Sequence, residues 1–143
     1  MRRSSFLAIF ALPALLATAS VAQAAPPSSP FSGTWLGQDT LPPVGDGSME
    51  HLVVKGGSNP QVDYQDEWGQ VCWDAGSTDL WFSSTLKASV TGNTMSGVFA
   101  RARCGHVALP AMKGLPMSWT FDPHGAGPAD DTLFDGVVTW RRV

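Results

Sequence analysis

From residue 31 onward, apolar and polar residues alternate with a period of two, and Gly, Pro, Asn and Asp interrupt the pattern at short intervals. Such alternation places every second side chain on one face of a β-strand. No stretch of ten or more residues has the spacing of an amphipathic helix. The pattern predicts eight strands, at residues 31–38, 49–55, 61–68, 71–74, 80–90, 94–103, 117–121 and 132–142.

The segment around residue 90 gives the clearest hairpin signal. Leu86, Ala88 and Val90 share one side of their strand, and Gly92-Asn93 follows directly. Both of these residue types accept a positive φ, as the tight turns that join antiparallel strands require. We therefore expect a two-residue turn leading into the next strand.

Two later segments repeat the alternation. Met117, Trp119 and Phe121 share one face of their strand. The last predicted strand carries on one face Phe134, Gly136, Val138 and Trp140. About eight short strands in one small domain predict an all-β fold, either an antiparallel up-and-down β-barrel or a curved sandwich.

The N-terminal residues have the pattern of an export signal. Arg2 and Arg3 precede an apolar run at 6–17, and Ala22-Gln23-Ala24 offers the small-x-small pattern of a cleavage site. The run is too short to span a bilayer. We expect a signal peptide at 1–24, a Pro-rich tether at 25–30, a barrel domain at 31–143, and a periplasmic or secreted location.

Charge limits the expected partners. Loss of the two leader arginines changes the formal net charge from −3 for the whole chain to −5. An acidic balance gives no electrostatic reason to bind nucleic acid or anionic lipid. We expect neither partner, and the oligomeric state stays open.

Cys72 and Cys104 are the only cysteines, and both lie in the exported part. An even pair in an oxidising compartment predicts a disulfide, which would stabilise the domain by about 3–4 kcal/mol. A metal site or redox pair would need Cys-x-x-Cys spacing or histidines in register, and neither is present.

Phe31-Ser32-Gly33-Thr34-Trp35 resembles the G-x-W opening of the calycin group, the lipocalins and avidins. The resemblance implies an up-and-down barrel in which Trp35 closes one end and a late arginine stacks on it. We assign that arginine to Arg141, with Arg142 as the alternative. Most of the mature chain, with its G-x-W start, the Asp46-Gly47-Ser48 turn, two cysteines around a hairpin and a Trp-x-Arg ending, looks like small exported bacterial β domains, and that likeness implies no activity.

A second segment is similar to the catalytic loop of aspartic proteases. Asp74-Ala75-Gly76-Ser77-Thr78-Asp79-Leu80-Trp81 matches most of its pattern, but Ala75 stands where that family has Thr or Ser. One loop supplies one aspartate, so activity would require a homodimer sharing a proton between two copies of Asp74. The alternative interpretation is a Gly-Ser turn between strands.

Six tryptophans suggest either a packed core or a ligand pocket. Our candidates for the pocket are Trp35, Phe99, Trp119 and Phe121. The three histidines lack metal-ligand spacing, so we expect no metal and no cofactor. We expect a non-enzymatic protein that holds a small apolar ligand in the barrel mouth. The alternatives are a protein-interaction or inhibitor module of the cell envelope and, more remotely, the protease-like hydrolase.

Overall fold

The structure is a computed structural model and describes residues 29–39, 47–67, 69–124 and 130–143. The predicted signal peptide at 1–24, with its cleavage site, and most of the predicted tether lie outside these residues. Within them the chain forms a sheet of nine antiparallel strands, one short helix and one 3-10 turn. The strands are β1 (Gly33–Gln38), β2 (Met49–Lys55), β3 (Gln61–Asp66), β4 (Phe82–Thr91), β5 (Thr94–Cys104), β6 (Val107–Ala108), β7 (Pro116–Asp122), β8 (Thr132–Phe134) and β9 (Thr139–Arg142). The helix is α1 (Gly69–Asp74), and the 3-10 turn is η1 (Pro110–Met112).

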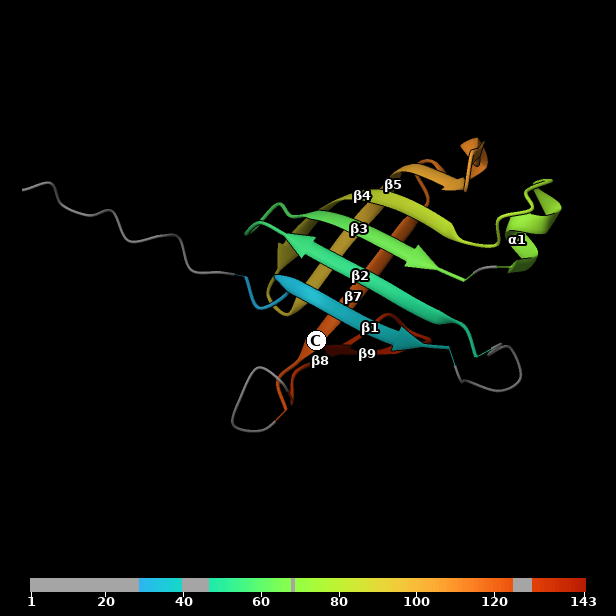
Figure 1. Cartoon of the computed structure of the whole chain (residues 1–143). Helices are drawn as coiled ribbons and strands as arrows, with labels where there is room; N and C mark the ends of the chain where they lie inside the picture. The colour runs from blue at the N-terminus through green and yellow to red at the C-terminus, as the bar shows by residue number, and fades with distance from the viewer. Residues whose placement is uncertain (1–28, 40–46, 68, 125–129) are drawn as a thin grey trace, which may run out of the picture.

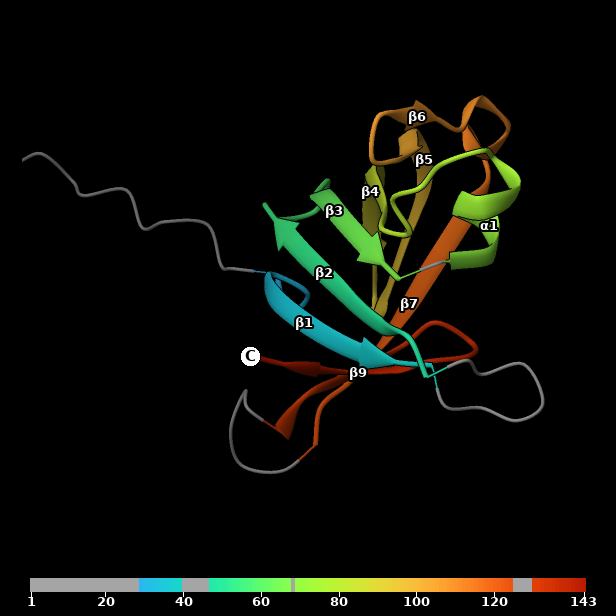
Figure 2. The ribbon, with the colours of Figure 1, turned by 45° about the vertical axis from the view of Figure 1, so that its right-hand side comes forward.

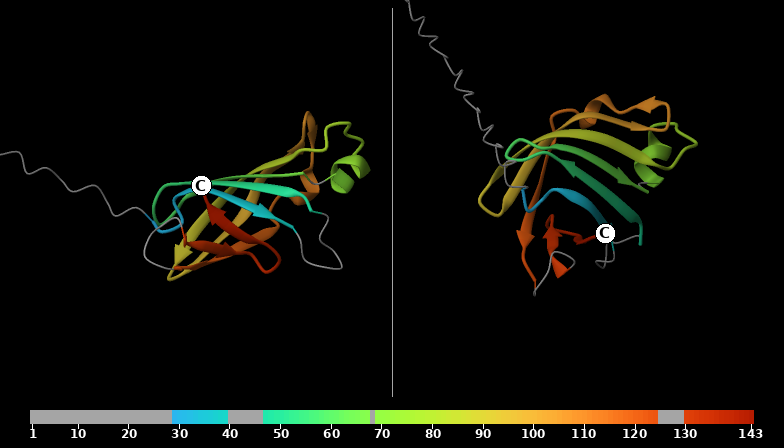
Figure 3. Two further views of the ribbon diagram at one scale, coloured as in Figure 1. Left: turned by 60° about the horizontal axis from the view of Figure 1, so that its bottom comes forward. Right: turned by 60° about the vertical axis from the view of Figure 1, so that its left-hand side comes forward.

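Eight of the strands close into a barrel, which confirms the predicted fold class and excludes the sandwich. Strands β1 to β5 pair in chain order, β7, β8 and β9 continue from the other edge of β5, and β9 pairs with β1. In Figure 1, β1–β4 run across the front and β7 crosses behind them. Figure 3 shows the green and yellow strands curving over the red C-terminal strands. The two-residue β6 extends the edge of β5 beyond the end of β7.

The alternating pattern placed the core residues correctly in the central strands. Leu86 is fully buried, with Ala88 and Val90 packed against the same core. The predicted turn joins β4 to β5, where Gly92 has a φ of +61° and Asn93 does not have a positive φ. This is the pattern of a type II′ turn, which needs a positive φ at its first central residue only.

The strand predicted at 71–74 is wrong, because these residues belong to the helix α1. Four residues are too few to distinguish a period of two from a single helical turn. Cys72 is the buried residue of α1, and its disulfide to Cys104 fixes the helix against the end of β5. Figure 2 shows α1 at that end of the barrel. The predicted disulfide is therefore confirmed.

The strand predicted at 132–142 is two strands, β8 and β9, joined by a tight turn. The Asp135 carboxylate accepts hydrogen bonds from the backbone N–H groups of Val137 and Val138, at 2.9 and 2.8 Å, and Gly136 has a φ of +103°. The turn shifts which residues point inward, so Phe134 and Trp140 no longer share a face. Phe134 is 46 % exposed, while Val138 and Trp140 are buried. Leu133 takes the inward position that the pattern assigned to Phe134.

Aromatic side chains fill the barrel. Trp35, Trp119 and Trp140 are fully buried. The Tyr64 ring centroid lies 5.9 Å from that of Trp140 and 5.8 Å from that of Phe82. An eight-stranded barrel is just wide enough for side chains of this kind to fill its interior. No helix in the described residues combines the length and apolarity needed to cross a bilayer.

Candidate functional site

The four residues predicted to bind a ligand are packing residues. Trp35 and Trp119 have no exposed surface, Phe99 is 6 % exposed, and Phe121 packs against the core at its edge. The ring centroids of Trp35 and Phe121 lie 6.5 Å apart near one end of the barrel, whereas Phe99 contacts Tyr64 and Phe82. The structure therefore does not bring the four together around one opening.

Trp35 and Arg142 close one end of the barrel. The Trp35 indole N–H donates to the Phe31 carbonyl at 2.9 Å, and the Arg142 guanidinium carbon lies 4.2 Å from the indole centroid. Arg142 also donates to the carbonyls of Ser32 and Pro30 and forms an ion pair with Asp131 at 3.4 Å. The assignment of Arg141 to this pair is wrong, because alternation along β9 leaves that side chain exposed on the outside.

The interior holds two buried carboxyl groups that the sequence analysis did not identify. Glu50 on β2 and Asp66 on β3 are direct cross-strand partners and are 6 % and 5 % exposed. The Tyr64 hydroxyl donates to Asp66 Oδ2 at 3.1 Å. The sequence does carry a signal for the burial of Glu50. It alternates with Leu52 and Val54, so it occupies an inward position of β2.

Burial raises the pKa of Glu50 from 4.5 to about 8, and the nearby carboxylates of Asp66, Asp135 and Asp39 add to the effect. Its Oε2 atom has no hydrogen-bond partner among the described residues. Glu50 is therefore mainly protonated at neutral pH. Burial, together with the carboxyl groups of Glu50, Asp66 and Asp135, raises the pKa of the Tyr64 hydroxyl, so it remains a hydrogen-bond donor.

Asp74, the candidate protease residue, ends the helix α1 and is exposed. Its carboxylate accepts a hydrogen bond from Gln70 Nε2 at 2.6 Å. The Ser77 hydroxyl in the following loop donates to the backbone carbonyls of Asp79 and Cys104. This segment holds α1 and its loop against β5, a structural role that accounts for its Gly-Ser sequence.

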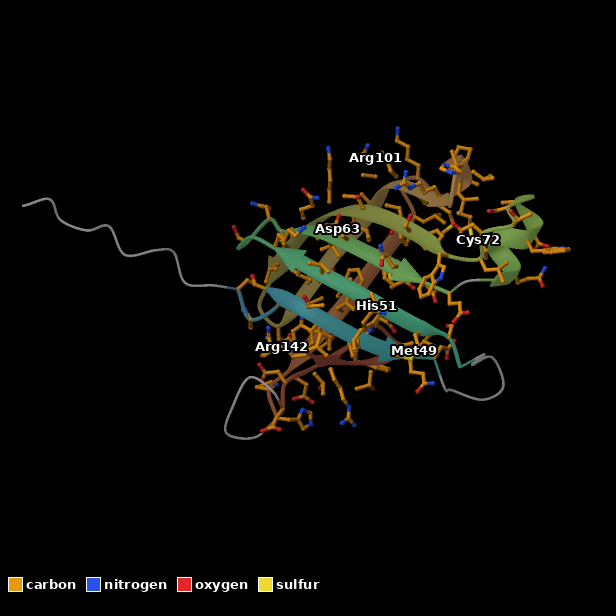
Figure 4. The ribbon with its side chains drawn as sticks, viewed as in Figure 1. Met49, His51, Asp63, Cys72, Arg101 and Arg142 are labelled. Atoms are coloured by element: carbon orange, nitrogen blue, oxygen red, sulfur yellow. A yellow bond between two sulfur atoms is a disulfide. The ribbon has the colours of Figure 1, made fainter. Side chains whose placement is uncertain are left out.

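A hollow whose lining includes basic and polar side chains lies outside the barrel. It is a groove of about 750 Å³ between the outer face of β2–β5 and the segment of β6 and η1. The pairing of the strands determines which residues form its floor. Asp63, Thr85 and Arg101 are cross-strand neighbours on β3, β4 and β5. The adjacent row consists of His51, Gln65, Ser83 and Arg103. We call this feature the outer groove, and His51, Asp63 and Arg101 mark its face in Figure 4.

Positive charge is concentrated on this side of the molecule. Seven Lys and Arg residues follow the predicted signal peptide, and five of them lie on the outward positions of β2–β5 or next to η1. They are Lys55, Lys87, Arg101, Arg103 and Lys113. Asp63 is the one acidic residue at an outward position of β2–β5, four strands that the structure describes in full.

The charge of Asp63 is already balanced. Its carboxylate accepts a hydrogen bond from Lys55 Nζ at 3.2 Å, with further donors from Gln61 and Thr85. Burial alone would raise the pKa of Asp63, but these hydrogen bonds and the Lys55 charge lower it. Arg101, Arg103 and Lys113 therefore give the outer groove a net positive charge.

No protein-family model, curated protein or solved structure matches the chain. The barrel is compatible with a calycin-like fold. Among the residues that the structure describes, no three His, Cys, Asp or Glu side chains gather in a way that could hold a metal ion. The molecule is thus a small disulfide-linked β-barrel with a packed interior and a basic groove on its outer face.

Proposed function

We propose that this protein is an exported, non-enzymatic binding module that recognises its ligand in the outer groove. The proposal differs from the small apolar ligand expected in the barrel mouth in the place of the site, and from the protein-interaction alternative in leaving the class of ligand open. The observation that carries it is the contrast between the aromatic packing inside the barrel and the open groove of about 750 Å³ outside. The Cys72–Cys104 disulfide is consistent with export.

The packed interior argues against the small apolar ligand that we expected in the barrel mouth. The Phe82 and Phe99 ring centroids are 5.9 Å apart, and Tyr64 contacts both rings. An apolar guest would have to displace side chains that are packed at the density of a crystal. Membership of the calycin group, with the interior ligand that it implies, is therefore a weaker basis for function than the outer groove.

The side chains of the outer groove do not favour catalysis. Ser83 and His51 have other neighbours: Ser83 accepts a hydrogen bond from Arg103 Nε at 3.4 Å, and His51 packs against Trp81. The second serine of the lining, Ser84, is buried at an inward position of β4. A nucleophile needs a base within hydrogen-bond reach, which this pairing does not supply. Binding is therefore the function that these contacts support best.

Site-specific photo-cross-linking in the native host tests the proposal. A photoreactive residue replaces Gln65, which is exposed on the groove floor, or Ser118, which is equally outward on β7 and serves as the control. We expect a discrete adduct from position 65 and none from position 118. Equal labelling from both positions would refute the outer groove as the binding site.

Native mass spectrometry of protein purified from the same host gives a second measurement. We expect the mass of the mature chain, without a retained apolar molecule. A tightly held apolar ligand would support a binding site inside the barrel and contradict the proposal.

A further inference from the structure

We infer that the outer groove binds an acidic oligosaccharide, a chain of sugar rings that carries carboxylate groups. The inference rests on the proposed function and names the chemistry of its ligand. Three features support it: a pair of arginines in the groove, a floor of neutral hydrogen-bonding groups, and an exposed indole that contacts His51 of the groove lining.

The arginines match repeated carboxylates. Arg101 and Arg103 lie two residues apart on the outer face of β5, so their side chains leave the strand about 7 Å from each other. Lys113 borders the groove from the end of η1. A guanidinium binds a carboxylate through two parallel hydrogen bonds, and a row of two such groups selects a ligand with spaced acidic groups.

The floor between these cations and His51 is polar and nearly neutral. Gln65, Ser83 and Thr85 present an amide and two hydroxyl groups. The hydrogen bonds of the two hydroxyl groups to Arg103 and Asp63 are long, at 3.4 Å each. These groups retain capacity to donate to and accept from a ligand that is rich in hydroxyl groups.

Trp81 adds an apolar plane beside the floor. Its side chain is 46 % exposed, and its ring centroid lies 6.4 Å from that of His51, which lines the groove. An exposed indole combines a large apolar face with one donor, which suits the C–H face of a sugar ring.

An acidic peptide fits the groove less well. Peptides that bind to sheets gain affinity by adding a strand to a free edge. This barrel is closed, and its one appended edge strand in the described chain, β6, has two residues. Peptide anchors also favour well-packed, desolvated pockets, whereas this floor carries an amide and two hydroxyls.

Titration calorimetry on the mature, disulfide-bonded protein at low ionic strength tests the inference. The probes are a hexamer of galacturonate, a neutral maltohexaose and hexaglutamate. We expect the hexauronate to bind and maltohexaose not to, with hexaglutamate at least about tenfold weaker than the hexauronate, because it has charge but no sugar rings.

Matched variants locate the site. Arg101→Gln with Arg103→Gln removes two charges from the groove lining, and Lys87→Gln with Arg141→Gln removes two exposed charges that do not line the groove. We expect the dissociation constant for hexauronate to rise about tenfold or more in the first variant and less than about twofold in the second. Trp81→Ala should weaken hexauronate binding about fivefold and leave hexaglutamate binding unchanged.

Three results would overturn the inference: no hexauronate binding, hexaglutamate binding of equal strength at the same arginines, or equal loss in both charge variants. Circular dichroism of each variant distinguishes lost binding from lost folding. None of these results decides the proposed function, which depends on cross-linking from Gln65.

Discussion

Replacement of Glu50 by Gln should make the protein more stable at alkaline pH. Glu50 is 6 % exposed inside the barrel and faces Asp66 across β2 and β3. Gln has nearly the same shape as the protonated acid and cannot ionise. Its amide can also donate a hydrogen bond, which a carboxylate cannot, close to the negative charge of Asp66.

The pKa of Glu50 determines the direction and the range of the effect. Below pH 4.5 the carboxyl is protonated in both the folded and the unfolded chain, so it adds no pH dependence. Between 4.5 and about 8 the unfolded chain loses a proton that the folded chain keeps, so stability falls as the pH rises. Above about 8 both states are ionised, and the loss is complete.

The rise in pKa sets an upper limit of about 5 kcal/mol, at about 1.4 kcal/mol for each pH unit. Local relaxation and entry of water reduce such costs, so we expect a gain of about 2–4 kcal/mol for Glu50→Gln near pH 8. At pH 4.5 and below, the variant should match the unaltered protein within about 0.5 kcal/mol.

Urea unfolding followed by tryptophan fluorescence at several pH values provides the measurement. Glu67→Gln is the matched control, since it removes the same charge from an exposed side chain. A difference between Glu50→Gln and the unaltered protein that does not change with pH would refute the reasoning. Lower stability of Glu50→Gln at pH 8 would refute it as well.

Three further predictions concern the packing of the barrel, and urea unfolding measures each. Replacing Cys72 and Cys104 together by Ser should lower the free energy of unfolding by about 3–4 kcal/mol, and reducing agent should then have no further effect. Arg142→Met should cost about 1–3 kcal/mol, because it leaves the carbonyls of Pro30 and Ser32 without their donor, while Arg141→Met should stay within about 0.5 kcal/mol; equal costs would contradict the role assigned to Arg142. Gly37→Ala should cost about 1–3 kcal/mol, because its Cβ would lie 2.6 Å from Val138 Cγ1, whereas Gly57→Ala meets no atom within 4 Å and serves as the control.

The sequence predicted the β-strands well where a strand has one buried and one exposed face over six residues or more. The bounds of β2 and the hairpin between β4 and β5 follow from alternation and from Gly92. The helix α1 and the turn at Gly136 were not predicted, because their apolar residues also fit a strand pattern. A contact distant in sequence, the disulfide, fixes α1. In the turn, hydrogen bonds from Val137 and Val138 to the Asp135 carboxylate set the conformation, and the alternation of apolar and polar residues does not encode them.

The candidate site was harder to predict, because it depends on which strands are neighbours. Net charge is a sum, so the value of −5 for the residues after the predicted signal peptide hides a face that carries five of the seven Lys and Arg residues in that part of the chain. Arg101 and Arg103 occupy outward positions of their strand, which alternation alone reveals. Their place beside Thr85 and Ser83 follows from register, including the shift in the β4–β5 pairing after Thr85, and no local pattern encodes it.

The pairing of β1 with β9 has a consequence for biogenesis. Arg142 donates to the Ser32 carbonyl across a separation of 110 residues, so the first strand has no permanent neighbour on one side until the last one arrives. A nascent or truncated polypeptide that stops before Thr139 would leave the unpaired backbone of β1 and β8 open to other chains or to proteases. Closure of the barrel must therefore wait for the C-terminal strand, and any holdase that binds the incomplete chain would act on those two edges.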